Sequence, residues 1–294
     1  MIGNISSPSL TLPTLTPREF DQIRRLAYDQ FGLELRPGKE QLVSARLSKI
    51  IRAMNLKSFQ QYYDFLLADK SGEALTAMID ALATNHTSFF REQAHFDFLK
   101  SIILPSLKLH PRICIWSAAC STGEEPYSIA FCLMQNLSPQ ELSRTRLLAT
   151  DISTKVLRIA EAGEYSAERF AGPLIHQLRP HLVKSEQKPG ASFRVKKEVR
   201  DLVEFRRQNL MQNFAHLGTF PLIFCRNVMI YFDSLTQQEL VRRLTDALEP
   251  EGYLFIGHSE SLNRIQHSLE YIQPAIYRKR ASSDSSKNRG RVRS

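Results

Sequence analysis

The amino-acid sequence predicts an α/β fold, in which a mostly parallel sheet follows a small helical domain and carries a small antiparallel β-insertion. Apolar residues first recur at helical spacing, from about residue 14 to 84. Short apolar runs then alternate with helical stretches from about residue 112, which is typical of a parallel sheet covered by helices. Between residues 165 and 203 the alternation is broken by Gly-Pro and Lys-Pro-Gly, which indicates an inserted element.

The first expected helix has signals at both of its ends. Thr16 can cap it, Pro17 suits its first turn, and Glu19 can complete a capping box. Gly32 is a good stop, because glycine readily adopts the left-handed conformation that ends many helices. Residues 1–13 are rich in serine, threonine and proline and predict a disordered lead-in.

Three more helices complete the expected helical domain, residues 14–84. The third helix opens at Ser58, with Gln61 three residues later. The apolar residues that mark the second, third and fourth helices are Val43, Leu47, Ile50, Ile51 and Met54, then Phe59, Tyr62, Tyr63, Leu66 and Leu67, then Leu75, Met78, Ile79 and Leu82. Because the connections are short, we expect these helices to pack as one small domain.

The second domain, residues 85–280, is expected to contain the sheet. Its candidate strands are the apolar runs 113–118, 147–151, 202–206, 222–225, 253–257 and 275–278. The last run directly follows another short apolar piece, which predicts a terminal hairpin. Within the insertion, about residues 166–203, Phe193 and Val195 alternate with basic residues as in a strand. Residues 281–294 predict a basic, disordered tail.

Composition excludes a membrane-spanning protein. Hydrophobic residues make up 43% of the chain, but no run approaches the roughly 18 apolar residues of a spanning helix. The first residues lack the basic and apolar regions of a secretory signal. The four cysteines have no metal-ligand spacing, which favours reduced thiols. We therefore expect a cytoplasmic protein without membrane insertion and without a metal.

The charge distribution does not indicate nucleic-acid binding. The chain carries a net charge of +9, of which residues 278–294 contribute +6 through seven basic residues and one acid. The rest of the chain is therefore only mildly basic. We expect no nucleic-acid partner, since a basic footprint over the folded part is missing.

The segment around the first strand predicts a cofactor loop. Residues 113–128 run from a strand through small residues into a helix, where Pro126 suits the first turn. Gly123 is the only glycine of the loop, so a pyrophosphate held by several glycines is poorly supported. Glu124 and Glu125 would repel a dinucleotide phosphate and would suit a cofactor with a positive charge. Alternatively, both acids simply favour the helix N-terminus.

Asp151 ends the next apolar strand. A carboxylate at this place can accept hydrogen bonds from the ribose hydroxyls of an adenosine. Its alternative role is to cap the following helix together with Ser153. Combined with the glycine-poor loop, Asp151 predicts an adenosine cofactor without a pyrophosphate.

Five motifs resemble those of the chemotaxis receptor methyltransferase (CheR) family. They are Thr84-Asn-His-Thr-Ser-Phe-Phe-Arg-Glu, Trp116-Ser-Ala-Ala-Cys-Ser-Thr-Gly-Glu-Glu-Pro-Tyr-Ser, Ala149-Thr-Asp-Ile, Phe224-Cys-Arg-Asn-Val-Met-Ile-Tyr-Phe-Asp and Gly257-His-Ser-Glu. The resemblance extends from about residue 15 to 280. It implies an S-adenosylmethionine-dependent methyltransferase sheet with an N-terminal helical domain and a small inserted antiparallel β-subdomain. It further implies methyl esterification of glutamate side chains on the cytoplasmic domains of chemotaxis receptors.

The resemblance also implies the residues of the site. S-adenosylmethionine would contact Asn85, Thr87, Arg91, Glu125, Asp151, Asn209, Leu210, Arg226 and Asn227. Arg91 and Tyr231 would flank the transferring methyl and hold the substrate glutamate. That carboxylate is already deprotonated at neutral pH, so no general base is needed and His86 and His258 are not expected to act as one. Without the resemblance, Arg91 would be a surface ion-pair residue and Tyr231 a core aromatic.

A row of cations on the second helix is a candidate surface for the receptor. Arg46, Lys49 and Arg52 recur every three residues and share one side of the helix. They would suit acidic receptor helices, although such a row is often an ordinary solvated face. We expect the protein to act on the receptor as a monomer.

Four other functions compete with receptor methylation. An oxidoreductase with a nicotinamide cofactor is disfavoured by the missing glycines. A nucleic-acid methyltransferase would carry an Asn/Asp-Pro-Pro-aromatic motif where this chain has Arg226-Asn-Val-Met-Ile-Tyr. An S-adenosylmethionine-binding sensor, or a methyltransferase that acts on a different protein, remains the alternative.

Overall fold

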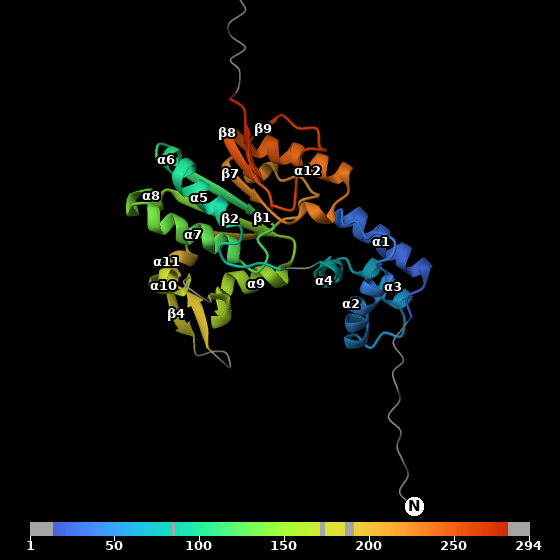
Figure 1. Ribbon diagram of the computed structural model, residues 1–294. Coiled ribbons are helices and arrows are strands. Elements are labelled where there is room, and N and C mark those ends of the chain that lie inside the picture. Colours follow the sequence, from blue (N-terminus) through green and yellow to red (C-terminus); the bar gives the residue numbers. More distant parts are fainter. Residues whose placement is uncertain (1–13, 84–85, 171–173, 186–190, 282–294) are drawn as a thin grey trace, which may run out of the picture. The chain divides into compact units, whose positions relative to one another are not determined.

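The computed structural model describes residues 14–83, 86–170, 174–185 and 191–281 (Figure 1). The chain divides into two compact units, Met1–Thr84 and Asn85–Ser294. The lead-in predicted for residues 1–13 lies outside the described residues, and so does the predicted basic tail except for residue 281. The two units are described separately.

The described residues of the first unit form four helices, as predicted. They are α1 (Pro17–Phe31), α2 (Glu40–Ala53), α3 (Phe59–Ala68) and α4 (Glu73–Leu82). The Thr16 hydroxyl accepts the N–H of Glu19 and the Glu19 carboxylate binds back to Thr16, which confirms the predicted capping box. Gly32 ends α1 with φ 68°, and Ser58 caps α3 by accepting the N–H of Gln61. The apolar faces of these helices form the buried interior of the unit, including Ile23, Ala27, Val43, Leu47 and Phe59.

The second unit is built on a seven-stranded sheet with the order β6-β2-β1-β7-β8-β10-β9. The bounds are β1 (Ile113–Ala118), β2 (Thr145–Asp151), β6 (Val203–Arg207), β7 (Phe220–Cys225), β8 (Leu248–Phe255), β9 (Leu269–Gln273) and β10 (Ile276–Lys279). β6, β2, β1, β7 and β8 are parallel, whereas β10 runs antiparallel to both β8 and β9. The mostly parallel sheet and the terminal hairpin are thus confirmed.

Helices cover both faces of this sheet. They are α5 (Gln93–Phe98), the π-helix η1 (Leu99–Ile103), α6 (Leu104–Leu107), α7 (Glu124–Asn136), α8 (Pro139–Ser143), α9 (Thr154–Ala162) and α12 (Ser234–Ala247). Residues of β1 alternate between two cores: Ile115 packs with α5 and α7, and Trp116 packs with α12. Figure 1 accordingly shows α7 and α12 on opposite sides of the strands. Trp116 is fully buried, as expected of a core residue, and its indole donates to Thr150 Oγ1.

The predicted insertion forms a small antiparallel sheet. Its strands are β3 (Glu164–Ser166), β4 (Leu182–Ser185) and β5 (Ser192–Val195), in the order β3-β5-β4. Short helical segments accompany them: η2 (Ala167–Phe170), α10 (Leu174–Leu178), η3 (Arg179–His181) and α11 (Lys197–Arg200). The sheet includes Glu164, two residues before the expected start of the insertion, because β3 pairs with β5. Phe193 and Val195 lie in β5, which confirms the expected strand there.

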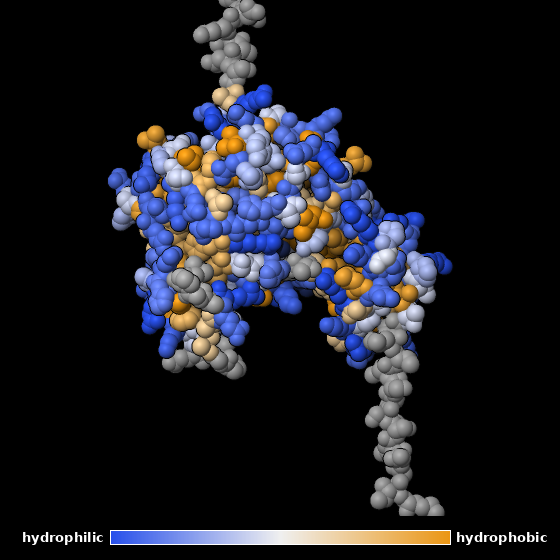
Figure 2. Space-filling model, viewed as in Figure 1, coloured by the Kyte–Doolittle hydropathy of each residue, from blue (hydrophilic) through white to orange (hydrophobic). Residues whose placement is uncertain are grey.

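The surface of the described residues is that of a polar protein. No described helix is both long and apolar enough to cross a membrane. On the face shown in Figure 2, hydrophilic side chains cover most of the surface, and hydrophobic ones lie in small groups between them. Scattered exposed apolar residues are normal for a folded protein.

Candidate active site

The carboxyl ends of four neighbouring strands bring most of the predicted site residues to one edge of the sheet. In the strand order β6-β2-β1-β7, Asn209 follows β6, Asp151 ends β2, the loop 119–123 follows β1, and Arg226 follows β7. Parallel strands place such positions side by side, which is where ligands bind in open α/β sheets. The sheet topology therefore groups residues that are far apart in the sequence.

Two residues in the loop between β1 and α7 adopt a left-handed backbone conformation although they are not glycine. Ala119 and Ser121 adopt positive φ angles of 63° and 50°, a conformation that costs energy for residues other than glycine. The loop is tied to the end of β2, because the Cys120 N–H donates to Thr150 O at 2.8 Å. The sequence did not reveal this backbone, since both residues are small but neither is glycine. Strain of this kind is typical of ligand sites.

Gly123 is the position in this loop where only glycine fits. Its φ is +98°, and a Cβ atom there would lie 2.8 Å from Ala160 Cβ and 2.8 Å from Tyr165 Oη. Tyr165 is held in place because its hydroxyl donates to Thr122 O at 2.7 Å. The close approach of α9 and β3 to Gly123 thus fixes the position at which α7 begins.

Asp151 holds the cofactor loop and the start of α9 at the same time. Its Oδ2 accepts the N–H of Ser121 at 2.9 Å, and its Oδ1 accepts the N–H of Ser153 at 3.0 Å. Ser153 itself caps α9 by accepting the N–H of Val156. The capping role considered for Asp151 is therefore present. A carboxylate at the carboxyl end of a parallel strand is also where the ribose hydroxyls of a nucleotide bind in folds of this class.

The two acids at the start of α7 each have a cationic partner. Glu125 accepts from Ser117 Oγ at 2.7 Å and pairs with Arg226 Nη1 at 3.0 Å. Burial raises the pKa of Glu125, and the nearby Arg226 opposes this shift only in part. Glu124 is buried as well and pairs with Arg169 at 3.2 Å. These arginine partners were not foreseen from the sequence, which offered only a positively charged cofactor or the helix N-terminus as the reason for the two acids.

Arg226 is the buried cation that joins three segments at this edge. Its guanidinium lies 2.9 Å from Glu92 Oε2 and 3.0 Å from Glu125 Oε2, and it donates to the backbone carbonyl of Arg91 at 2.5 Å. Only 2% of its side chain is exposed, so the two carboxylates compensate a charge that solvent hardly reaches. Arg226 thus connects the end of β7 to α7 and to the segment before α5.

Glu92 is a site residue that the sequence reasoning missed. Burial raises its pKa, but the charge of Arg226 and the N–H of His258 outweigh that effect and leave the pKa lowered. Its Oε1 accepts the His258 N–H at 3.1 Å and lies 3.4 Å from Asn227 Nδ2. One signal in the sequence could have identified Glu92 as a site residue: it directly follows Arg91 in the motif that begins at Thr84.

The loop after β7 is held by a second buried carboxylate. Glu260 accepts the N–H groups of Asn227, Met229 and Gly257 at 2.9, 2.7 and 2.5 Å. Burial raises the pKa of Glu260, while these N–H donors lower it. Asn227 has φ 58°, and a Cβ on Gly257 would meet its side chain at 2.2 Å. This packing explains why glycine and glutamate stand at these places in the motif at residues 257–260.

The remaining predicted site residues occupy different surroundings. Arg91 is half-buried, and its guanidinium donates to His86 O at 3.0 Å. The Thr87 carbonyl accepts from Arg169 at 2.9 Å. Tyr231 is half-buried in η5 (Met229–Tyr231). Of the other predicted contacts, Asn85 lies outside the described residues. Leu210 is buried in the core beneath α12, and the side chain of Asn209 accepts the N–H of Met211.

In the cation row on α2, Arg46 bonds to another helix of the same unit. Arg46 is half-buried and donates to the carbonyls of Leu82 and Ala83, which end α4. Lys49 and Arg52 are exposed, and Arg52 Nε donates to Ser48 O at 3.3 Å within its own helix. Arg46 therefore stabilises the C-terminus of α4, whatever else the row contacts.

Comparison with known proteins gives matches over nearly the whole chain. A family model described as "CheR methyltransferase, SAM binding domain" matches residues 85–277, and "CheR methyltransferase, all-alpha domain" matches residues 18–83. The chain is 39% identical over 273 residues to a chemotaxis protein methyltransferase of Borreliella burgdorferi, covering 90% of this chain and 95% of that one. It is 38% identical to chemotaxis protein methyltransferase 2 of Pseudomonas aeruginosa (89% and 93%) and 36% identical to the Escherichia coli chemotaxis protein methyltransferase (90% and 91%).

Proposed function

Because this chain belongs to the CheR methyltransferase family, we propose that it transfers the methyl group of S-adenosylmethionine to glutamate carboxylates of chemotaxis receptors. The observation that carries this conclusion is the match of both family domains, one after the other, over residues 18–83 and 85–277. Relatives named chemotaxis protein methyltransferases cover the chain at 36–39% identity. The enzyme is an S-adenosylmethionine-dependent methyltransferase, and the alternative of a non-enzymatic sensor is not favoured.

The residues at the sheet edge fit the cofactor. Asp151 ends β2 at the sheet edge where nucleotide folds bind ribose hydroxyls, and the loop 119–123 offers close backbone approach without a pyrophosphate site. We propose Thr87, Arg91, Glu125, Asn209, Leu210, Arg226 and Asn227 as further contacts, together with Asn85. S-adenosylmethionine, when bound, supplies a methyl group on a positively charged sulfur. Glu124 pairs with Arg169, whereas Glu125 shares the guanidinium of Arg226 with Glu92, so this single cation does not balance both of its carboxylates.

The chemistry at the substrate requires positioning rather than proton transfer. The glutamate carboxylate is deprotonated at neutral pH, so it is already a nucleophile. We propose that Arg91 and Tyr231 orient it, the first through its guanidinium donors and the second through its hydroxyl. The backbone of Arg91 is held by Arg226, which links substrate orientation to the buried ion cluster. Burial and the charge of Arg226 lower the pKa of His95 to about 3, so this neighbouring histidine is neutral at physiological pH.

The proposal includes the cellular setting and the domain organisation. We propose that the protein acts as a monomer in the cytoplasm on the cytoplasmic domains of receptors, without membrane insertion or nucleic-acid binding. The proposed domains are residues 14–84 for the receptor-facing helices and 85–280 for methyl transfer, with a β-subdomain at about 166–203.

The function is tested by methyl transfer to a defined acceptor. The purified chain is incubated with S-adenosylmethionine carrying a radiolabelled methyl group and with candidate receptor cytoplasmic domains. We expect label that mild base releases as methanol, because carboxylate methyl esters hydrolyse in base. Receptor domains whose methylated glutamates are replaced by glutamine should take up no label. Base-stable label, or label on the glutamine variant, would assign the enzyme a different acceptor group.

Tyr231→Phe is expected to separate chemistry from cofactor binding. Removing one hydrogen bond to the reacting carboxylate should lower turnover about tenfold, while the Kd for S-adenosylmethionine stays within about twofold. Turnover is measured with saturating receptor and cofactor, and the Kd by calorimetry. Tyr271→Phe, on the exposed face of β9, is the matched control and should change neither quantity. A wild-type rate for Tyr231→Phe would remove this residue from the reaction.

Neutralising the exposed cations of α2 is expected to weaken receptor recognition alone. Lys49→Ala with Arg52→Ala avoids Arg46, whose loss would release the end of α4. We expect kcat/KM for the receptor to fall about fivefold at low salt with unchanged cofactor affinity. The difference should shrink as added salt shortens the Debye length from about 10 Å to 3 Å. Lys39→Ala with Lys57→Ala, two exposed lysines outside the row, is the control. Equal rates for the two double variants would make the row an ordinary solvated face.

A further inference from the structure

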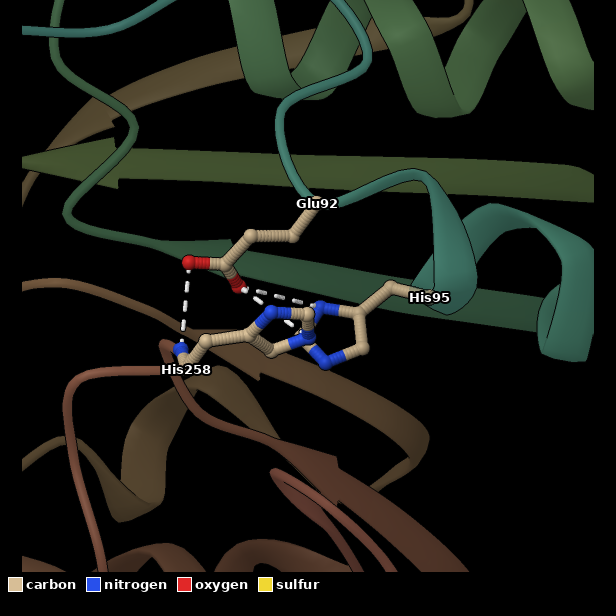
Figure 3. A group of neighbouring side chains, drawn as sticks. All are labelled: Glu92, His95 and His258. Carbon is tan, nitrogen blue, oxygen red and sulfur yellow. Dashed lines mark hydrogen bonds and ion pairs between the residues drawn. The ribbon is translucent and has the colours of Figure 1, made fainter.

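We propose that Glu92, His95 and His258 form a binding site for a zinc-like transition-metal ion beside the methyl-transfer site. Figure 3 shows the carboxylate of Glu92 facing both imidazole rings. Nothing in the methyl-transfer chemistry requires either histidine, because the carboxylate nucleophile needs no base. The three side chains come from the start of α5 and from the segment after β8, so the fold brings them together from distant parts of the chain.

The geometry suits three ligands around one ion. Glu92 Oε2 lies 3.6 Å from His95 Nδ1 and 4.0 Å from His258 Nε2, and the three ligand atoms lie within 4.8 Å of one another. Zinc ligands at their usual bond lengths stand about 3.3 Å apart, so the ligand atoms must approach one another further. His258 can supply most of that movement, since 46% of its side chain is exposed.

A second observation is the state of His95. The residue is completely buried, yet among the described residues neither of its ring nitrogens has a hydrogen-bond partner. Its ring is held by packing against Phe255, with the centroids 4.8 Å apart. Buried polar atoms normally have partners, so an unpartnered buried nitrogen that faces a carboxylate calls for a ligand. A metal ion would satisfy His95 Nδ1 directly.

The ligand set selects the class of ion. Two imidazoles and one carboxylate suit zinc and its transition-metal neighbours, and this combination leaves a coordination position for water. Magnesium and calcium prefer sites made only of oxygen ligands. Glu92 and His95 are three residues apart at the start of α5, so the helix holds them as a rigid pair. The side chain of His258 is more mobile and completes the set of ligands.

Occupancy of the site would oppose methyl transfer, an effect that rests on the proposed function. Glu92 Oε2 also pairs with Arg226 at 2.9 Å, and Arg226 holds Glu125 and the backbone of Arg91. A divalent ion on Glu92 would repel this guanidinium and draw away its carboxylate partner. By linkage, S-adenosylmethionine and the metal ion should then weaken each other's binding by the same factor.

Direct metal binding tests the site independently of any methyl transfer. The full-length protein, freed of metal with a chelator, is titrated with Zn²⁺ by calorimetry and with Co²⁺ by visible absorption. We expect one ion per chain and cobalt bands of four- or five-coordinate nitrogen and oxygen ligation. His258→Ala should lose at least about tenfold in zinc affinity, because loss of a ligand exceeds the loss of an outer-shell partner. His216→Ala, an exposed histidine elsewhere, should bind like the wild type.

The remaining outcomes are equally decisive. Zinc affinity that is unchanged in His258→Ala, or Mg²⁺ binding of similar strength, would overturn the site. For the coupling, each variant's methyl-transfer rate with zinc is divided by its own rate without zinc. We expect this ratio to fall at least about fivefold in the wild type and to stay near one in His258→Ala. Zinc binding without any effect on the ratio would overturn the coupling, whereas a protein that methylates no receptor would contradict the proposed function only.

Discussion

Replacing Arg226 with alanine is expected to lower the free energy of unfolding by about 3–5 kcal/mol, the usual cost of removing one partner of a buried ion pair. The substitution leaves Glu92 and Glu125 in a poorly solvated place without their shared cation. It also removes the donor to the Arg91 carbonyl. Urea unfolding of the full-length protein, followed by circular dichroism and by the fluorescence of its single tryptophan, measures the change.

The pH dependence of this loss has a definite sign. Arg226 lowers the pKa of Glu92 relative to its unpaired state, so the stabilisation exists above the unfolded pKa and is lost as pH falls through the folded value. The difference between wild type and Arg226→Ala should therefore shrink as the pH falls below the ordinary pKa of a glutamate, about 4.3, because a protonated carboxyl needs no cation. Arg242→Ala is the matched control: its pairs with Glu239 and Asp246 are exposed, and it should cost at most about 1 kcal/mol. Equal losses for the two arginines would contradict the buried cluster.

Replacing Gly123 with alanine is expected to damage both stability and cofactor binding. The new Cβ would meet Ala160 and Tyr165 at 2.8 Å while the backbone keeps a φ of +98°. Overpacking and the positive φ together should cost about 2–4 kcal/mol of unfolding free energy. Because the loop must move to relieve the contact, we expect the Kd for S-adenosylmethionine to rise at least about tenfold, roughly 1.4 kcal/mol. Calorimetry on the folded fraction measures this change.

Gly72→Ala separates the two causes. Gly72 also stands directly before a helix in the left-handed conformation, with φ 72° and ψ 6°, but no atom lies within 4 Å of its would-be Cβ. This variant should cost about 1 kcal/mol for the backbone conformation alone and leave cofactor affinity unchanged. If Gly123→Ala behaved like Gly72→Ala, the close packing of α9 and β3 against the loop would have no energetic consequence.

The helix ends show how much local sequence can predict. Thr16, Glu19 and Gly32 set the start and end of α1 through contacts within a few residues, so their roles could be predicted before any tertiary contact was known. The same is true of β1, whose bounds match the apolar run 113–118. The start of β8 was predicted less well, because pairing with β7 extends this strand back to Leu248, before the apolar run 253–257.

By itself the sequence determined the fold class and the two family domains, and it supplied the candidate site residues, because periodicity and motifs are carried by neighbouring positions. Only the tertiary structure decided the partners of those residues. Arg226 and Glu125 are 101 positions apart and meet because β7 lies beside β1 in the sheet. Likewise, Glu92 reaches His258 across 166 positions. Charge compensation in a buried site depends on which strands are neighbours, and strand order is a property of the folded sheet rather than of any local stretch of sequence.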